Sequence, residues 1–211
     1  ETESTVFQYI GELCRYLTSS PPDPFERQHR LRICTGNGMR PDVWERFRDR
    51  FAIPQIIEFY AATEGTVSLY NVEGKVGAVG RVPNFMAARS PALIVRHDVE
   101  TGLPLRDSDG RCIPAGFDDP GELLGRLASR REHRFEGYTD NRETDRKVLC
   151  DVLEPGDRWM RTGDLMRRDA QGFYYFVDRI GDTFRWKGEN VATTEVANAL
   201  AGCPGVVEAS V

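Results

Sequence analysis

Short apolar segments divided by turn residues run from Ser68 to about Leu127, and they restrict the fold more than any other feature. The segments VSLYNV, KVGAVGRV, ALIVRHD and GELLGRL have strand length, and turns such as TGLP and SDGR between them are rich in glycine, proline and aspartate. Short strands at this spacing are typical of a small antiparallel barrel or sandwich. The middle of the chain is therefore predicted to be β structure.

The first part of the chain has a different pattern, in which helices and strands alternate. Apolar residues recur at helical spacing from Val6 to Leu17, which predicts one amphipathic helix before the breaker SSPPDP. A strand is predicted over Leu31–Cys34, followed by a turn at GNGMRP and a helix with Pro41 in its first turn. The buried face of that helix is predicted to carry Trp44, Phe47 and Phe51. After Pro54, the run IIEFY predicts a buried strand.

The last part of the chain again mixes strands and helices. A helix is predicted near Asn141, and WMRTGDLMRRDAQGFYYFVDR reads as two strands joined by the DAQG turn. The segment TTEVANALAGCPG predicts a helix that ends at Gly202, and VVEASV predicts a final strand.

Composition and charge exclude several classes of function. The chain has 211 residues and a formal net charge of −5, with no basic run interleaved with aromatic residues, so a nucleic-acid partner is not expected. No apolar run is long enough to span a membrane, and the start ETESTVFQYI lacks the order of a signal peptide. The five cysteines are scattered, which favours reduced thiols in a cytosolic compartment over disulfides or a zinc site.

Residues with chemical potential follow the predicted strand IIEFY. Tyr60, Thr63 and Glu64 occur where this strand ends, in FYAATEG. Ligands of open α/β sheets bind at such strand ends. An aromatic ring can stack on a base, a hydroxyl can bond a phosphate oxygen, and a carboxylate can hold a hard cation such as Mg²⁺. An ordinary turn has the same composition, so both interpretations stay open at this point.

Three further motifs have a structural and a functional interpretation each. The GNG motif at Gly36–Gly38 allows a flat ligand to approach the backbone closely, or forms a tight turn. Asp164 in RTGDL can present both carboxylate oxygens to a vicinal diol such as a ribose, or form an Asx turn. Arg179 can pair with a phosphate, or with Asp178 or Asp182.

The order of these motifs is far more specific than each motif alone. GNG, YAATEG, GELLGRL, RTGDL and GFYYFVDRIGDTFRWKGENV, in this order, resemble the adenylate-forming superfamily of acyl-CoA synthetases, luciferases and peptide-synthetase adenylation domains. Within it, DRIGDTFRWKGENVATTEV, FEGYTDNRETDRKVL and VFQYIGELCRYL are similar to the fatty acid transport protein or very-long-chain acyl-CoA synthetase branch. The resemblance covers essentially the whole chain.

The resemblance implies an α/β plus β fold, which is the second part of a large domain followed by the start of a small α+β C-terminal domain. Residues 1–67 would be the α/β portion of the AMP-binding domain, and 68–180 its β-barrel subdomain and end. Residues 181–211 would be a hinge and the start of the C-terminal domain. The hinge would fall at Gly181, next to Asp182, whereas many relatives carry a charged residue at the hinge position itself.

The resemblance also implies roles for individual residues. Tyr60 would stack on adenine, and the backbone of Gly36, Asn37 and Gly38 would line the other side of the base. Thr63 would contact the α-phosphate, and Glu64 would hold Mg²⁺. Asp164 would bind the ribose hydroxyls, with Arg179 near the ribose and phosphate. Lys187 and Gly188 would lie on the surface that meets CoA.

By resemblance, the expected activity is that of an ATP-dependent long-chain or very-long-chain fatty acyl-CoA ligase with ATP and Mg²⁺ as cofactors and CoA as co-substrate. Two alternatives stay open: a fatty-acid uptake component with secondary ligase activity, and an enzyme that passes the acyl group to a carrier protein. The family places such proteins in the cytoplasm, with peripheral attachment to the cytoplasmic face of a membrane.

The family's phosphate loop and its C-terminal catalytic lysine have no counterpart in this sequence. We therefore expect the 211 residues to be an internal fragment that runs adenylation inefficiently by itself. Acyl chain length and oligomeric state are not indicated by the sequence.

Overall fold

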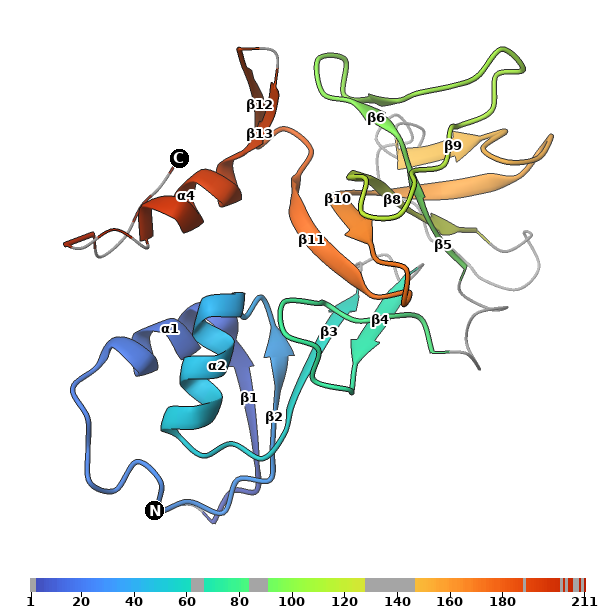
Figure 1. Ribbon diagram of the computed structural model, residues 1–211. Coiled ribbons are helices and arrows are strands. Elements are labelled where there is room, and N and C mark those ends of the chain that lie inside the picture. The colour runs from blue at the N-terminus through green and yellow to red at the C-terminus, as the bar shows by residue number, and fades with distance from the viewer. Residues whose placement is uncertain are drawn as a thin grey trace, which may run out of the picture.

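The fold comes from a computed structural model of the chain. The structure describes residues 3–61, 67–83, 91–127, 147–187 and 189–201, together with residues 203, 205, 206, 209 and 211. Two main sheets and a C-terminal unit of a hairpin and a helix make up these residues (Figure 1).

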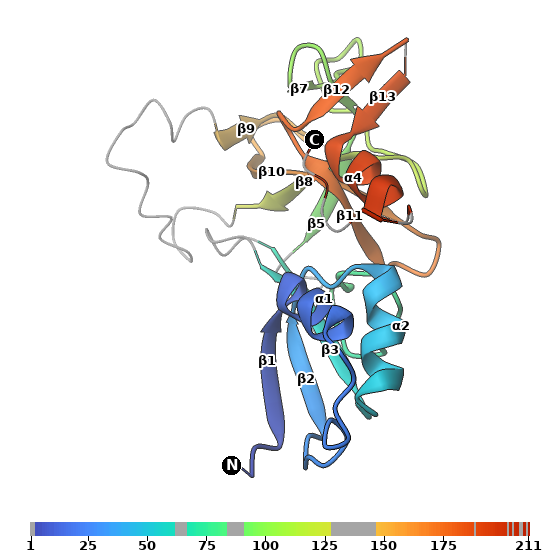
Figure 2. The same ribbon diagram turned by 90° about the vertical axis from the view of Figure 1, so that its left-hand side faces the viewer.

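The first sheet has the strand order β1-β2-β3-β4. Its strands are β1 (Val6–Ile10), β2 (Ile33–Asn37), β3 (Ile56–Ala61) and β4 (Ser68–Asn71). The first three run parallel and β4 is antiparallel to β3. Helices α1 (Gly11–Ser19) and α2 (Pro41–Arg50) connect the parallel strands and cover one face of the sheet, as Figure 2 shows from the side. Between helices and sheet lies an apolar core that includes Cys34, Trp44 and Phe47.

The helix predicted from Val6 to Leu17 is wrong in its first half, because residues Val6–Ile10 form strand β1. The sequence VFQYI is rich in residues that favour strands, and its pairing with β2 fixes the choice. The helical part begins at Gly11, and its buried residues are Gly11, Cys14 and Thr18.

The next elements follow the prediction more closely. Strand β2 begins two residues later than predicted and continues through Gly36 and Asn37, so the expected turn at GNG starts later. Helix α2 is confirmed, with Pro41 in its first turn. Trp44 and Phe47 are buried as predicted, and the half-buried Phe51 packs against the same core. The strand predicted from IIEFY is β3.

The second sheet confirms the predicted antiparallel β structure. Its strand order is β11-β10-β8-β5, with β9 paired to β10, and all of its pairs are antiparallel. The strands are β5 (Ala92–Val95), β8 (Gly121–Arg126), β9 (Val148–Cys150), β10 (Arg158–Arg168) and β11 (Tyr174–Arg179). The short strands β6 (His97–Asp98) and β7 (Leu103–Pro104) form a separate pair.

One strand belongs to a different sheet from the one expected. The sequence pattern predicts VSLYNV as part of the barrel, but β4 pairs with β3 in the first sheet. The ladder with β3 satisfies backbone groups of β4 there, which a local pattern of turns cannot reveal. The domain boundaries at 67/68 and 180/181 remain predictions.

The C-terminal unit contains β12 (Thr183–Trp186), β13 (Glu189–Ala192) and α4 (Thr193–Ala201). The predicted turn at DAQG and the predicted last helix are confirmed. The hairpin β12–β13 was not predicted. The final strand is not formed by Val206, Ala209 and Val211, which lie outside any strand, and the helix predicted near Asn141 falls outside the described residues.

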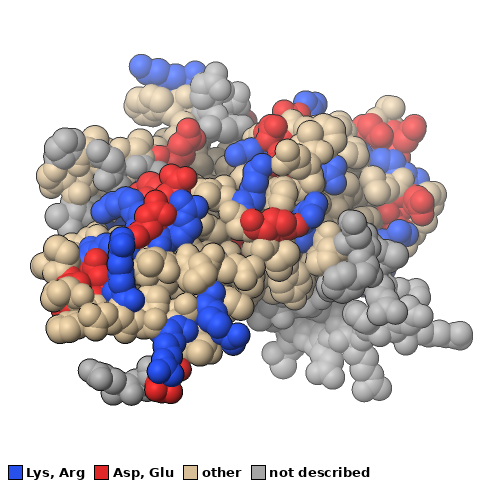
Figure 3. Space-filling view, turned by 60° about the horizontal axis from the view of Figure 1, so that its bottom comes forward, with Lys and Arg blue, Asp and Glu red and all other residues tan. Residues whose placement is uncertain are grey.

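The surface carries charges of both signs. On the face shown in Figure 3, Lys and Arg side chains are interspersed with Asp and Glu side chains, with no broad field of one sign. No helix within the part of the chain that the structure describes is long and apolar enough to cross a membrane.

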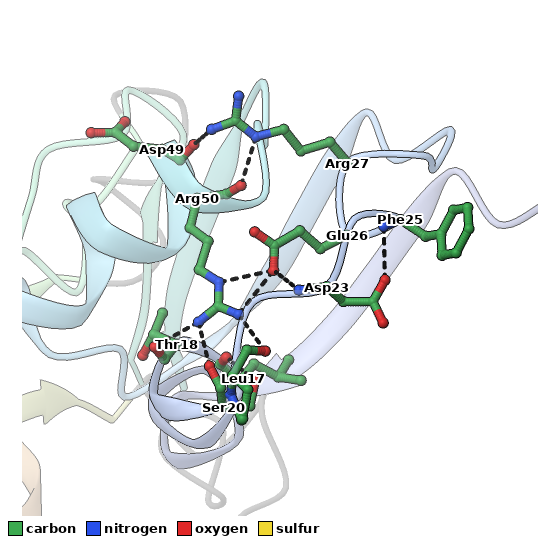
Figure 4. Close-up of polar contacts among 10 residues, drawn as sticks. Leu17, Thr18, Ser20, Asp23, Phe25, Glu26, Arg27, Asp49 and Arg50 are labelled. Carbon is green, nitrogen blue, oxygen red and sulfur yellow. Dashed lines mark hydrogen bonds and ion pairs between the residues drawn. The ribbon is translucent and has the colours of Figure 1, made fainter.

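Arg50 at the end of α2 fixes the long connection between α1 and β2 (Figure 4). Its guanidinium donates to the Glu26 carboxylate at 2.9 and 3.0 Å and to the carbonyl oxygens of Thr18, Ser20 and Pro21. Arg27 of the same connection donates back to the carbonyl oxygens of Asp49 and Arg50. A proline-rich segment without secondary structure of its own is thereby held against the helix.

We predict that Arg50→Ala loosens this connection, because five hydrogen bonds from one guanidinium are lost together. Limited proteolysis between Ser20 and Arg30 is expected to become severalfold faster. The matched control is Arg48→Ala on the same helix, whose exposed side chain pairs only with the adjacent Asp49 among the contacts described for it. Equal cleavage rates for the two variants contradict the assignment.

Candidate functional site

Three of the predicted site residues meet between the two sheets. The Tyr60 hydroxyl, from β3, donates to Asp164 Oδ2 at 2.6 Å. Arg179 Nε lies 3.6 Å from Asp164 Oδ1, across the ladder between β10 and β11. The Asp164 side chain is 14% exposed and that of Arg179 is 73% exposed. The group therefore combines a phenol, a partly buried carboxylate and a guanidinium open to solvent.

A bulge in β10 orients the Asp164 side chain toward Tyr60. The register between β10 and β8 shifts between Arg161 and Leu165, and Gly163 adopts φ +77° in that interval. The Thr162 hydroxyl donates to the Leu123 carbonyl oxygen at 2.8 Å and accepts from the Asp164 amide at 3.2 Å. Bulges commonly redirect a side chain at the edge of a site, and this one presents Asp164 to Tyr60.

A buried ion pair supports the same stretch of β10. The Glu122 side chain on β8 is 0% exposed, and Arg161 donates to both of its oxygens at 2.8 to 3.0 Å. Arg161 also donates to the Gly102 carbonyl oxygen at 2.7 Å. Burial raises the pKa of Glu122, and the guanidinium opposes that shift. The pair fixes the strand immediately before the bulge.

A second buried carboxylate lies in the first sheet. Tyr9, Gly36 and Glu58 are direct register partners on β1, β2 and β3, so they form a row across the sheet. A Cβ on Gly36 would lie 2.6 Å from the Tyr9 ring, so only glycine lets that ring cross β2. The Tyr9 hydroxyl reaches Glu58 Oε1 at 2.7 Å.

Glu58 also accepts two hydrogen bonds from the backbone of the GNG segment. The Gly38 amide donates to Oε2 at 3.0 Å and the Met39 amide to Oε1 at 3.1 Å. Burial raises the pKa of Glu58 to about 7, against the opposing effect of these bonds. Burial and the neighbouring Glu58 carboxylate raise the pKa of Tyr9.

The two interpretations of GNG therefore apply to different residues. Gly36 is required by packing within the chain, against Tyr9. Gly38 has φ +76° and open space where a Cβ would stand, and Asn37 and Gly38 are exposed at the carboxyl end of β2. Tyr60 is near the carboxyl end of the adjacent β3, so the same sheet edge carries both. That edge is where a ligand of such a sheet binds.

The predicted hinge coincides with a turn between β11 and β12. Gly181 has φ +104° and is exposed, and the Asp182 amide donates to the Arg179 carbonyl oxygen at 3.1 Å. Just before it, the buried Asp178 accepts from the hydroxyls of Thr193 and Thr194 at 3.2 and 3.1 Å. A carboxylate at the start of α4 also suits the helix dipole. Asp178 thus connects the second sheet to the C-terminal unit.

Lys187 lies away from the Tyr60 group. It occupies the turn of the β12–β13 hairpin with φ +51°, and its ammonium lies 5.9 Å from the centre of the Trp186 ring. Figures 1 and 2 both show the tip of this hairpin pointing away from β1–β4. Thr63, Glu64 and Gly188 lie outside the described residues. Within the described residues, no three His, Cys, Asp or Glu side chains form a group that could hold a metal ion.

Sequence reasoning missed Tyr9, Glu58, Glu122, Arg161 and the bonding role of Asp178. A usable signal existed for the two glutamates, because each is a charged residue inside an apolar strand, in IIEFY and in GELLGRL. A buried charge almost always has a partner. The identity of the partners was not readable, since Tyr9 lies 49 positions from Glu58 and Arg161 lies 39 positions from Glu122.

Solved structures define the class of fold. The chain resembles the ATP-bound MatB from Rhodopseudomonas palustris with a TM-score of 0.70 and 21% identity, over 98% of this chain and 37% of that one. It resembles a benzoate CoA ligase from Burkholderia xenovorans LB400 with a TM-score of 0.67 and 23% identity, over 100% and 37% of the two chains. The fold is therefore that of part of an adenylate-forming CoA ligase.

Sequence comparison gives the branch within this class. The chain is 48% identical over 208 residues to human long-chain fatty acid transport protein 3, covering 98% of the chain and 30% of that protein. It is 43% identical to the medium/long-chain-fatty-acid–CoA ligase FadD6 of Mycobacterium tuberculosis, covering 99% of the chain and 34% of that protein. No family model matches the chain. Over essentially its whole length the chain is therefore similar to long-chain fatty acid transport proteins and a fatty-acid–CoA ligase, and it spans about a third of the length of these relatives.

We predict that Arg161→Ala destabilises the chain by roughly 3–5 kcal/mol, because it leaves the Glu122 charge buried without its partner. Urea unfolding followed by circular dichroism measures this change. Arg96→Ala is the control, since Arg96 and Asp119 form an exposed pair 3.9 Å apart. That substitution is expected to change the free energy of unfolding by no more than about 0.5 kcal/mol. Similar values for both variants contradict a supporting role for the buried pair.

Proposed function

We propose that the chain contributes the nucleotide site of an AMP-forming long-chain fatty acyl-CoA ligase. The observation that carries the proposal is the Tyr60–Asp164–Arg179 group, at a sheet edge where ligands of α/β folds bind. In the first half-reaction, a fatty carboxylate attacks the α-phosphorus of ATP and pyrophosphate leaves. In the second, the CoA thiolate attacks the acyl-adenylate, which gives the thioester and AMP.

Each residue of the group has a chemical task in this proposal. The half-buried Tyr60 ring packs against an apolar cluster that draws on both sheets, and in this proposal it offers the adenine a stacking surface. Its hydroxyl uses only one of the acceptor positions of Asp164, so the carboxylate can still accept from both hydroxyls of a ribose. The exposed Arg179 supplies positive charge next to the ribose, where the phosphates follow. Positioning and charge, with no covalent protein intermediate, then lower the barrier.

Magnesium would be held mainly by the nucleotide, with Glu64 as its protein ligand. Mg²⁺ commonly takes one or two carboxylates together with substrate phosphates, so a single glutamate fits its chemistry. The bound ion would neutralise charge on the triphosphate. An ATP- and magnesium-bound o-succinylbenzoate CoA synthetase from Bacillus subtilis, which shares the fold with a TM-score of 0.63, supports this part of the proposal. Thr63 would contact the α-phosphate.

Rotation of the C-terminal unit about Gly181 and Asp182 would bring Lys187 and Gly188 to the CoA side for the second half-reaction. The open backbone at Gly181 supports this, because a hinge must absorb a large change in φ and ψ. In the described arrangement, Lys187 is exposed at the hairpin tip.

A second function, fatty-acid uptake with secondary ligase activity, is supported by the names of the relatives, which are long-chain fatty acid transport proteins. Peripheral attachment to a membrane belongs to the same proposal. Uptake that survives Asp164→Ala while ligase activity is lost would favour transport as the primary role. Transfer to a carrier protein instead of CoA is the third candidate, and the choice of acceptor in a pyrophosphate-release assay separates it from the ligase.

We predict that the chain binds AMP and that Asp164→Ala weakens this binding at least tenfold, because the ribose loses its charged acceptor. Tyr60→Phe is expected to weaken it less, because the stacking ring remains. Calorimetric titration measures both affinities. Tyr175→Phe is the matched control, since that hydroxyl bonds Asp169 on the distant turn of the second sheet. If Asp164→Ala and Tyr175→Phe bind AMP equally well, the assignment of Asp164 is wrong.

We also predict that the 211-residue chain alone forms acyl-CoA at no more than a trace rate, because its relatives use about three times as much chain. The measurement is thioester formation from palmitate, ATP and CoA by the purified chain. Turnover comparable to that of a complete ligase contradicts this prediction.

A further inference from the structure

We propose that Glu58 is a positioning residue for nucleotide binding, which holds the backbone of Gly38 and Met39 at a fixed distance from Tyr60. The proposal rests on the function proposed above, because it assigns a task to a residue that would not touch the nucleotide. Its basis is the set of hydrogen bonds around one buried carboxylate in the first sheet.

Strand β3 connects the two sides of the proposed adenine site, which are Tyr60 and the backbone of Gly38 and Met39. Glu58 and Tyr60 are both on β3, two positions apart, and successive side chains of a strand alternate between its faces. They therefore share one face, with Tyr60 at the ligand edge and Glu58 one step inside it. From there Glu58 reaches across to β2 and accepts from the amides of Gly38 and Met39. The backbone segment that would line adenine is thereby fixed to the strand that carries the stacking ring.

The carboxylate is chemically suited to this task. All three described partners of Glu58 are donors, namely two amides and the Tyr9 hydroxyl, so an ionised carboxylate satisfies them with both oxygens. An amide side chain of the same shape has one acceptor oxygen and would turn an NH₂ group toward a donor. Gly38 has φ +76°, a conformation that glycine adopts without strain, and its amide donates to Glu58 from there.

Glu58 differs from the other ionisable groups around it in the pH range over which it changes charge. The titratable groups that face this site in the described part of the chain are Tyr9 from β1, Cys14 from α1 and Cys34 from β2. Burial raises the pKa of Cys14 to about 12 and that of Cys34 to about 11, and it also raises that of Tyr9. Glu58, with a pKa of about 7, is therefore the group in this cluster that changes charge near neutral pH.

The test compares the unmodified chain with Glu58→Gln and Tyr9→Phe. Tyr9→Phe is the matched control, because it removes one hydrogen bond of Glu58 and leaves both backbone bonds in place. Hydrogen exchange by NMR measures the protection of the Gly38 and Met39 amides, and calorimetry measures AMP affinity. Glu58→Gln is expected to lower the protection of both amides and to weaken AMP binding about tenfold. Tyr9→Phe is expected to weaken AMP binding less than threefold, even where it lowers the melting temperature.

A pH series on the unmodified chain keeps the test decisive if Glu58→Gln does not fold. Because burial raises the pKa of Glu58 to about 7, the closed arrangement binds a proton more tightly than an opened one does, so the protection factors of Gly38 and Met39 are expected to be higher below about pH 7 and to fall as the pH rises through it. Protection of core amides such as that of Leu123 is expected to stay constant. Protection that does not change with pH contradicts the proposal.

The outcomes separate the two proposals. If the unmodified chain binds AMP and Glu58→Gln binds it equally well, Glu58 has no positioning role and the proposed function stands. If the unmodified chain does not bind AMP at all, the nucleotide site is wrong and the positioning role is wrong with it. An equal loss of affinity in Glu58→Gln and Tyr9→Phe would reduce Glu58 to a stabilising core residue, which also overturns the proposal.

Discussion

One buried carboxylate holds the first sheet in the form that the site requires. Glu58 is 2% exposed and joins three parallel strands through Tyr9 on β1 and the amides that follow β2. Burying an ionised group is costly, and three donors offset part of that cost here, although burial still raises the pKa of Glu58 to about 7. The glycine at position 36 is part of the same solution, because any side chain there would block the path of the Tyr9 ring. Residue types that look unrelated in the sequence thus satisfy one physical requirement.

The candidate site exists because two sheets with different architectures share a border. The parallel strands supply Tyr60, and the antiparallel sheet supplies Asp164 and Arg179 through a bulge. The second sheet also depends on a buried acidic group, since Glu122 anchors Arg161 just before that bulge. Both halves of the site therefore have a rigid support one step behind the surface. Rigid support of this kind keeps a ligand contact in place without contributing to the contact itself.

The predictability of each element depended on how local its determinants are. Helix α2 and the turn between β10 and β11 were predicted, because Pro41 and the DAQG sequence act within a few residues of themselves. Strand β1 was not, because VFQYI also fits a helical spacing and only its pairing with β2 decides between the two. The resemblance indicated Tyr60, Asp164 and Arg179, which the structure brings together, but Glu58 became visible only with its partner 49 positions away. Charge inside an apolar strand was the clue, and its meaning required the fold.

The hydrogen bonds that Asp178 accepts restrict how the C-terminal unit can move. Its two oxygens accept both threonine hydroxyls at the start of α4, only three residues before the glycine at which the chain can turn. Because the two bonds share one acceptor group and one helical turn, rotation breaks them together. In the proposed rotation about Gly181, the C-terminal unit would have to give up both bonds to leave the described orientation. Two hydrogen bonds to a charged group amount to a few kcal/mol, so they favour the described orientation of the unit by about that much. Asp178 would thus stabilise the described orientation of the C-terminal unit against the proposed rotation.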